Sequence, residues 1–238
     1  MLPSLVEKSD MLRPAMYNPR PAVPISISRG ALALIVMLAA VFTIFGAVAG
    51  LPLQTAAIVG SLGGAVSLLF HEWGHIRAAS SVAGLRPRSV SLQWAGAATT
   101  FEGRYQNGRD QIRVAVGGPQ ASFILALALF AVCVLPAPMS TKEPLVLLAV
   151  FNIALGLLNL VPAYPLDGYK LVTGFLWSLT GSEAKALRIV RRIGIGWAAL
   201  EAPAALLLLV EKPALGGLVL MVGAVLLVQK RLMPVRAH

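Results

Sequence analysis

Two histidines and a glutamate lie close together in an apolar stretch, as His71-Glu72-Trp73-Gly74-His75. On an α-helix, residues four positions apart share one face, so both imidazoles can bind one metal ion. Glu72 lies beside them, where a carboxylate can accept a proton from a water molecule that the metal activates. The pattern indicates a catalytic zinc site, although short motifs of this kind also occur by chance.

A catalytic zinc site has three protein ligands and an open position, so the two histidines need a third partner. A candidate is Asp167, in residues 159–168, which read N-L-V-P-A-Y-P-L-D-G. Asp167 could instead cap the helix that follows it, and the two roles can coexist through different carboxylate oxygens. The single cysteine, Cys133, excludes a cluster of thiolate ligands.

The elements that must position these side chains are membrane spans. Hydrophobic residues make up 57% of the 238 residues and charged residues 13%, against about 45–50% and about 25% in soluble domains. Three windows without charge each reach the ~18–20 apolar residues that a membrane helix needs, and the first is long enough for two. The sequence predicts an all-α polytopic membrane protein with six transmembrane helices, at about 30–50, 53–79, 112–136, 143–163, 190–210 and 213–229.

The basic residues predict the orientation of these spans. Six spans place both termini on one side, together with 18 of the 20 lysine and arginine residues. The positive-inside rule makes that side cytoplasmic, and the motifs of the second and fourth spans then share the cytoplasmic half of the cell membrane. Topology thus explains the net charge of +10 without nucleic acid, and the expected partners of this charge are membrane lipids.

Three regions follow from this topology. Residues 1–29, with five prolines, are predicted to be a basic cytoplasmic tail, residues 30–229 a single membrane domain, and residues 230–238 a second cytoplasmic tail. A compact form without an appended soluble domain is expected. Leu171–Thr180 is apolar but too short to cross, which predicts a re-entrant or interfacial helix.

A small β-hairpin is expected after the second span. Residues 88–94 alternate apolar with polar side chains, a turn follows at 95–96, and residues 98–102 suit a return strand. We expect this hairpin to offer an edge to an unwound substrate segment, at Val90, Leu92 or Thr100. The alternative is a hairpin that only packs against the helices.

The paired motifs resemble those of the site-2 proteases, a family of intramembrane zinc metalloproteases. Members combine a membrane-embedded H-E-x-x-H helix with a later N-x-x-P-x-x-x-L-D-G segment, and both are intact here. A G-P turn that opens the intervening span is recognisable as Gly117-Gly118-Pro119, whereas many relatives carry asparagine where Ser122 stands. The resemblance covers roughly residues 55–180, the expected zinc-site core.

The resemblance implies an endopeptidase that cuts a single-span membrane protein in or near its transmembrane segment. One Zn²⁺ per chain would be held by His71, His75 and Asp167, with Glu72 activating water. Asn159 would orient the substrate or stabilise the developing oxyanion, although a hydrogen bond between helices explains this residue nearly as well.

Two other functions stay open at this point. A transporter or channel could use the intramembrane acids Glu72, Asp167 and Glu201, but the sequence lacks the paired broken helices typical of transporters. Glu201 could also gate access to a site. A catalytically silent zinc scaffold is the second alternative, yet the glutamate that hydrolysis requires is present.

Overall fold

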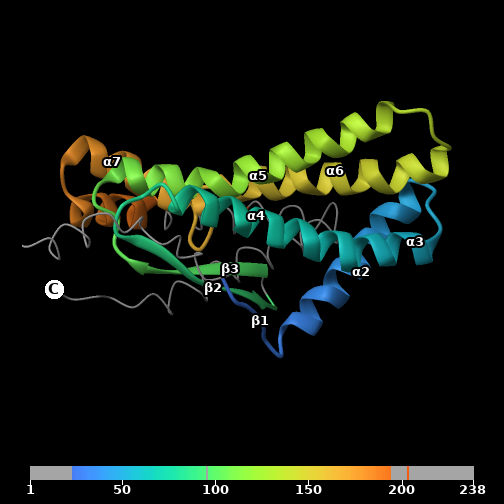
Figure 1. Cartoon of the computed structure of the whole chain (residues 1–238), viewed down its shortest axis with the longest axis horizontal. Helices are drawn as coiled ribbons and strands as arrows, with labels where there is room; N and C mark the ends of the chain where they lie inside the picture. Colours follow the sequence, from blue (N-terminus) through green and yellow to red (C-terminus); the bar gives the residue numbers. More distant parts are fainter. Residues whose placement is uncertain (1–22, 95, 194–202, 204–238) are drawn as a thin grey trace, which may run out of the picture.

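The computed structural model describes residues 23–94 and 96–193, together with residue 203. Most of this part is helical, and Figure 1 shows the arrangement. In chain order the elements are β1 (Ile25–Ile27), α2 (Ala31–Val48), α3 (Leu53–Ile58), the π-helical turn η2 (Val59–Gly63), α4 (Gly64–Ala79), β2 (Leu85–Gln93), β3 (Gly96–Gly103), α5 (Gly108–Val134), α6 (Met139–Asn159) and α7 (Asp167–Thr180). Residues 183–193 are also helical.

Four helices in the described part are long and apolar enough to cross a membrane. They are α2, the continuous helix Leu53–Ala79 formed by α3, η2 and α4, then α5 and α6. They correspond to the first four predicted spans, each within about four residues of the expected bounds. The predicted sixth span and Glu201 lie outside the described residues, as does the fifth span beyond residue 193.

Helices α4, α5 and α6 lie side by side, and α2 crosses them obliquely (Figure 1). Glycines allow the closest of these contacts. A side chain on Gly74 would collide with the backbone carbonyl of Gly117, and a side chain on Gly117 would collide with Gly74 in turn. Small residues at helix crossings are how helices pack tightly in lipid, where the hydrophobic effect between helices is absent.

The G-P element corrects one expectation. Gly117-Gly118-Pro119 does not form a turn at the start of a span, because α5 begins at Gly108 and continues through Pro119. The side chain of Asn107 caps α5 by accepting a hydrogen bond from the backbone N–H of Asp110 at 2.9 Å. The polar first turns are therefore part of the same helix as the apolar span.

The sheet is larger than the predicted hairpin. Its strand order is β1-β2-β3, with β1 parallel to β2 and β2 antiparallel to β3. Residues 25–27 pair with residues 90–92, although the sequence predicts that they belong to a tail. The hairpin is confirmed, but β2 is the central strand, so one of the two expected free edges is occupied.

Helix α7 lies at the end of the bundle where α5 begins (Figure 1). A side chain on Gly108 would collide with the backbone carbonyl of Gly174, so the two helices touch through their backbones. At 14 residues, α7 is too short to span a membrane, as the sequence predicts for this segment. Its first residue is Asp167, whose side chain is buried.

Candidate active site

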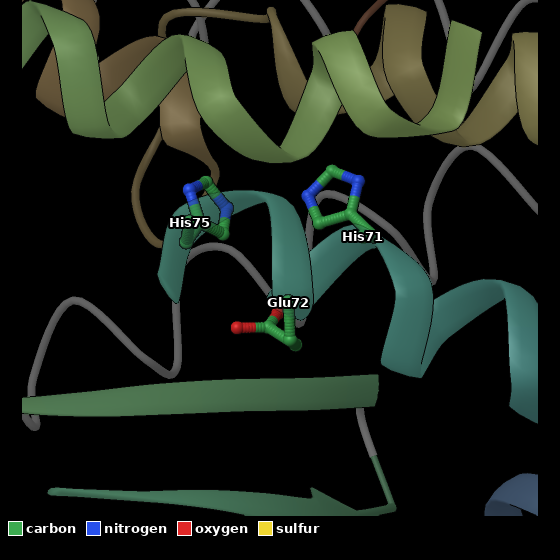
Figure 2. A group of neighbouring side chains, drawn as sticks. All are labelled: His71, Glu72 and His75. Carbon is green, nitrogen blue, oxygen red and sulfur yellow. The ribbon is translucent and has the colours of Figure 1, made fainter. Parts of the chain in front are cut away.

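Helix α4 presents the two predicted histidine ligands on one side. His71 and His75 are 3% and 4% exposed, and their ring centroids lie 5.1 Å apart. Figure 2 shows both rings pointing toward α5, while Glu72 points toward β3. The i, i+4 spacing therefore places both imidazoles on one buried face of the helix, as the sequence predicts.

The structure brings Asp167 to both rings. Its Oδ2 atom lies 3.0 Å from Nε2 of His71 and 2.9 Å from Nε2 of His75. Asp167 is the first residue of α7, and one of its two oxygens, Oδ2, is directed at the histidines. The three side chains predicted as ligands thus meet at one point, from elements more than 90 residues apart.

The outer ring nitrogens fix how the imidazoles face this point. Nδ1 of His75 donates a hydrogen bond to the backbone carbonyl of Val114 at 2.7 Å, and Nδ1 of His71 lies 2.9 Å from the hydroxyl of Ser122. Because a carbonyl can only accept, Nδ1 of His75 carries the proton and Nε2 presents its lone pair in the neutral ring. Outer hydrogen bonds of this kind orient histidine ligands of metals.

The donor set fits a divalent cation. Lone pairs on neutral imidazole nitrogens and an anionic carboxylate oxygen repel one another at about 3 Å unless a proton or a metal ion lies between them. Two nitrogen ligands and one oxygen ligand are a set that zinc binds in catalytic sites. Potential ligand atoms of His71, Glu72 and His75 all lie within 4.8 Å of one another.

Gly118 keeps space free at this point. A side chain there would collide with Nε2 of His71 and with Nε2 of His75, the two nitrogens that face Asp167. From the sequence, Gly118 is expected only as part of the Gly117-Gly118-Pro119 element. A glycine in the interior of a long helix destabilises that helix by about 1 kcal/mol relative to alanine. Its presence there therefore indicates a position where a side chain would not fit.

The carboxylate of Glu72 is held by the sheet. Glu72 is 7% exposed, and its Oε2 atom accepts a hydrogen bond of 2.6 Å from the hydroxyl of Thr99 on β3. This contact was not anticipated from the sequence, since Thr99 lies 27 residues further along the chain. The predicted base thus lies beside the predicted ligands, on the side of the sheet.

Lys170 completes the charged surroundings. Its ammonium lies 3.3 Å from Oδ1 of Asp167, the oxygen that does not face the histidines. Burial acts to raise the pKa of Asp167, but hydrogen bonds from His71 and His75 when those rings are protonated, together with the charges of His75 and Lys170, outweigh it and lower the pKa below its usual range. A cation in the place of those protons favours the ionised carboxylate in the same way. Asp167 is therefore ionised, as a carboxylate ligand must be.

The side chain of Asn159 forms its hydrogen bond within its own helix. Asn159 is the last residue of α6, and its side-chain amide donates to the carbonyl of Leu155 in the same helix at 2.9 Å. The structure therefore brings together Glu72 and the three predicted ligands. It leaves the expected role of Asn159 in substrate or oxyanion binding as a prediction.

The expected edge residues fall on two different strands. The backbone N–H of Val90 donates to Pro24, and the carbonyl of Leu92 accepts from Ser28, both at 3.0 Å. These groups face β1 and are not free to pair with a substrate, which corrects the expectation for Val90 and Leu92. Thr100 lies on β3 and is exposed, with its hydroxyl 2.8 Å from that of Ser89.

Known proteins share features of this sequence and fold. The profile of Peptidase family M50 matches residues 135–200. A Synechocystis protein named as a zinc metalloprotease is 33% identical over 137 residues, which cover 56% of this chain and 36% of the relative. For the Mycobacterium tuberculosis protein Rip3, also named as a zinc metalloprotease, the identity is 35% over 149 residues, or 59% and 37% of the two chains.

The chain thus spans little more than a third of the length of these curated relatives. The fold matches more completely: the site-2 protease of Methanocaldococcus jannaschii superposes with a TM-score of 0.56 at 21% identity, covering 86% of this chain and 88% of that one. The resemblance inferred from the motifs is therefore confirmed. In sequence and in fold the chain is similar to the site-2 proteases of Peptidase family M50, and its four long apolar helices indicate a multi-pass membrane protein.

Proposed function

We propose that this protein is an intramembrane zinc endopeptidase, which hydrolyses a peptide bond in or near the transmembrane segment of a membrane-protein substrate. One observation carries the proposal. Oδ2 of Asp167 lies about 3 Å from Nε2 of His71 and from Nε2 of His75, inside a bundle of apolar helices. A carboxylate, that of Glu72, lies beside them.

His71, His75 and Asp167 would hold one Zn²⁺, for which Gly118 leaves room. When bound, zinc polarises the scissile carbonyl and lowers the pKa of water. Glu72 accepts a proton from the attacking water and returns it to the leaving nitrogen. Val114 and Ser122 hold the imidazoles in place through their outer nitrogens. A binding or positioning role for Asn159 belongs to the same proposal, from its place in the family motif.

The proposed topology has six spans, with both termini and the site toward the cytoplasm. His71 lies 18 residues after Leu53 in a continuous helix, which is about 27 Å at ~1.5 Å per residue. The hydrocarbon core of a membrane is about 30 Å thick. A site near the cytoplasmic boundary of the core follows, and it favours peptide bonds close to the cytoplasmic end of a single-span substrate.

The proposed substrate-binding edge is β3. Strand β2 is paired on both sides in the sheet, whereas β3 pairs with β2 alone among the described strands. Strand β3 also contacts α4, and Figure 2 shows it between α4 and β2, next to Glu72. A substrate segment must unwind before its peptide bonds are accessible, and pairing with an edge strand replaces the helical hydrogen bonds that it loses.

Metal-dependent proteolysis by the purified protein tests the proposed function. In liposomes with a panel of single-span substrates, the protein is expected to cleave at least one, and a zinc chelator is expected to stop cleavage. Glu72→Gln is expected to bind zinc normally but to lose at least about 100-fold in kcat, the usual contribution of a general base. Solute flux without cleavage, or zinc binding without cleavage by the native protein, would indicate a transporter or a scaffold instead.

Gly118→Ala tests the metal site independently of activity. The added methyl would occupy the space between the two ligating nitrogens, so zinc measured by elemental analysis is expected to fall to less than about a tenth per chain. Gly63→Ala is the control, because its methyl would meet only the flexible end of Leu148, at 3.1 Å. Full zinc occupancy in Gly118→Ala would place the metal elsewhere.

Proline at Ala97 tests the proposed edge. Backbone groups alternate in direction along a strand, and Leu92, the partner of Ala97, turns its backbone toward β1, so the N–H of Ala97 faces the free edge of β3. Proline at an edge-facing position removes this donor and leaves the ladder with β2 intact, so Ala97→Pro is expected to raise KM for a helical substrate several-fold. Ala97→Ser, which keeps the backbone N–H, should retain the native KM. Zinc content and melting temperature are measured in both variants, and native kinetics in a well-folded Ala97→Pro protein would exclude β3 as the binding edge.

A further inference from the structure

Thr99 lies on the face of the sheet that packs against the helices. Ala97 and Phe101 pack against the two buried apolar clusters of the described structure. Since side chains alternate along a strand, Thr99 must face the helices between them. The Thr99 hydroxyl lies between the apolar side chains of Ala97 and Phe101 on this face of β3 and is hydrogen-bonded to Glu72.

Helix α4 alone cannot set the direction of the Glu72 carboxylate. Neighbouring residues on an α-helix point about 100° apart, and Figure 2 shows the two histidines directed at α5 and Glu72 directed at β3. The histidines are held by Val114 and Ser122 of α5. A glutamate has three side-chain torsions, so another element must restrain its carboxylate if that group is to stay near the metal ligands.

The contact with Thr99 supplies this restraint. The hydrogen bond from the threonine hydroxyl to Oε2 is short, at 2.6 Å. Glu72 is 7% exposed, so little water competes for the same oxygen. The bond engages Oε2 and leaves Oε1 as the oxygen that can exchange a proton with a reactant.

We propose that Thr99 is a positioning residue for the general base: by fixing Oε2 of Glu72, it keeps the carboxylate aimed at the attacking water. The inference rests on the proposed peptidase function and deepens it. In this role the side chain of Thr99 touches neither the substrate nor the metal ligands. It acts through Glu72, and therefore on the rate of the chemical step rather than on substrate binding.

Three variants test the proposal. Thr99→Val keeps the shape of the side chain but removes the hydroxyl, and it is expected to lower kcat about 10- to 100-fold with KM changed less than about twofold. Thr99→Ser retains a hydroxyl and should recover kcat to within about threefold of the native value. Ser91→Ala is the control, because it removes a hydroxyl from the neighbouring strand β2 without touching Glu72.

Zinc content and melting temperature separate positioning from a structural role. Both should stay native in Thr99→Val, so that the loss is confined to kcat. Unchanged kcat in Thr99→Val would overturn the proposal, and so would an equal loss in Thr99→Ser. A loss of kcat that follows a loss of zinc or of folded protein would also overturn it.

A second measurement does not depend on activity. In crystal structures of Thr99→Val and Thr99→Ser, the carboxylate of Glu72 should be rotated or disordered in the former and native-like in the latter. A native-like carboxylate in Thr99→Val would overturn the inference even if the peptidase assay failed for every protein. Absence of cleavage by the native protein, with Glu72 displaced in Thr99→Val, would instead count against the proposed function alone.

Discussion

A carboxylate oxygen lies about 3 Å from each of two imidazole nitrogens inside a bundle of apolar helices, and all three atoms are electron-rich. In such surroundings their mutual repulsion is weakly screened, and water that could relieve it is scarce. A divalent cation turns this repulsion into three attractive contacts, and its binding energy stabilises the folded chain. The remaining features of the core serve to hold these three atoms at one point.

Close backbone contacts make that convergence possible. Gly74 and Gly117 let α4 and α5 approach closely, and Gly118 leaves the ligating nitrogens uncovered. The start of α7 brings in Asp167, and its backbone contact with α5 fixes where that start lies. On the other side of α4, β3 restrains Glu72 and offers the proposed edge for a substrate. Binding of a substrate strand and orientation of the base would then depend on the same strand, since Thr99 lies on it.

Features that depend on local spacing could be predicted from the sequence, and those that depend on distant pairing could not. The histidines follow from the helical period, four spans follow from hydropathy, and Asp167 follows from its motif together with the charge-derived topology. Strand β1 is three residues long and pairs with a strand more than 60 residues away, so no periodicity reveals it. Its presence makes β2 central and moves the free edge away from Val90 and Leu92. The partnership of Thr99 with Glu72 likewise depends on how the sheet packs against α4.

X-ray absorption at the zinc edge of the purified protein tests the central claim most directly. One zinc ion per chain is expected, with two imidazole nitrogens and at least one oxygen among its ligands and with no sulfur. Asp167→Ala should weaken zinc binding and remove the carboxylate contribution, because that side chain supplies the third ligand. Zinc that is absent from the native protein, or zinc whose ligands include no imidazole, would contradict the account.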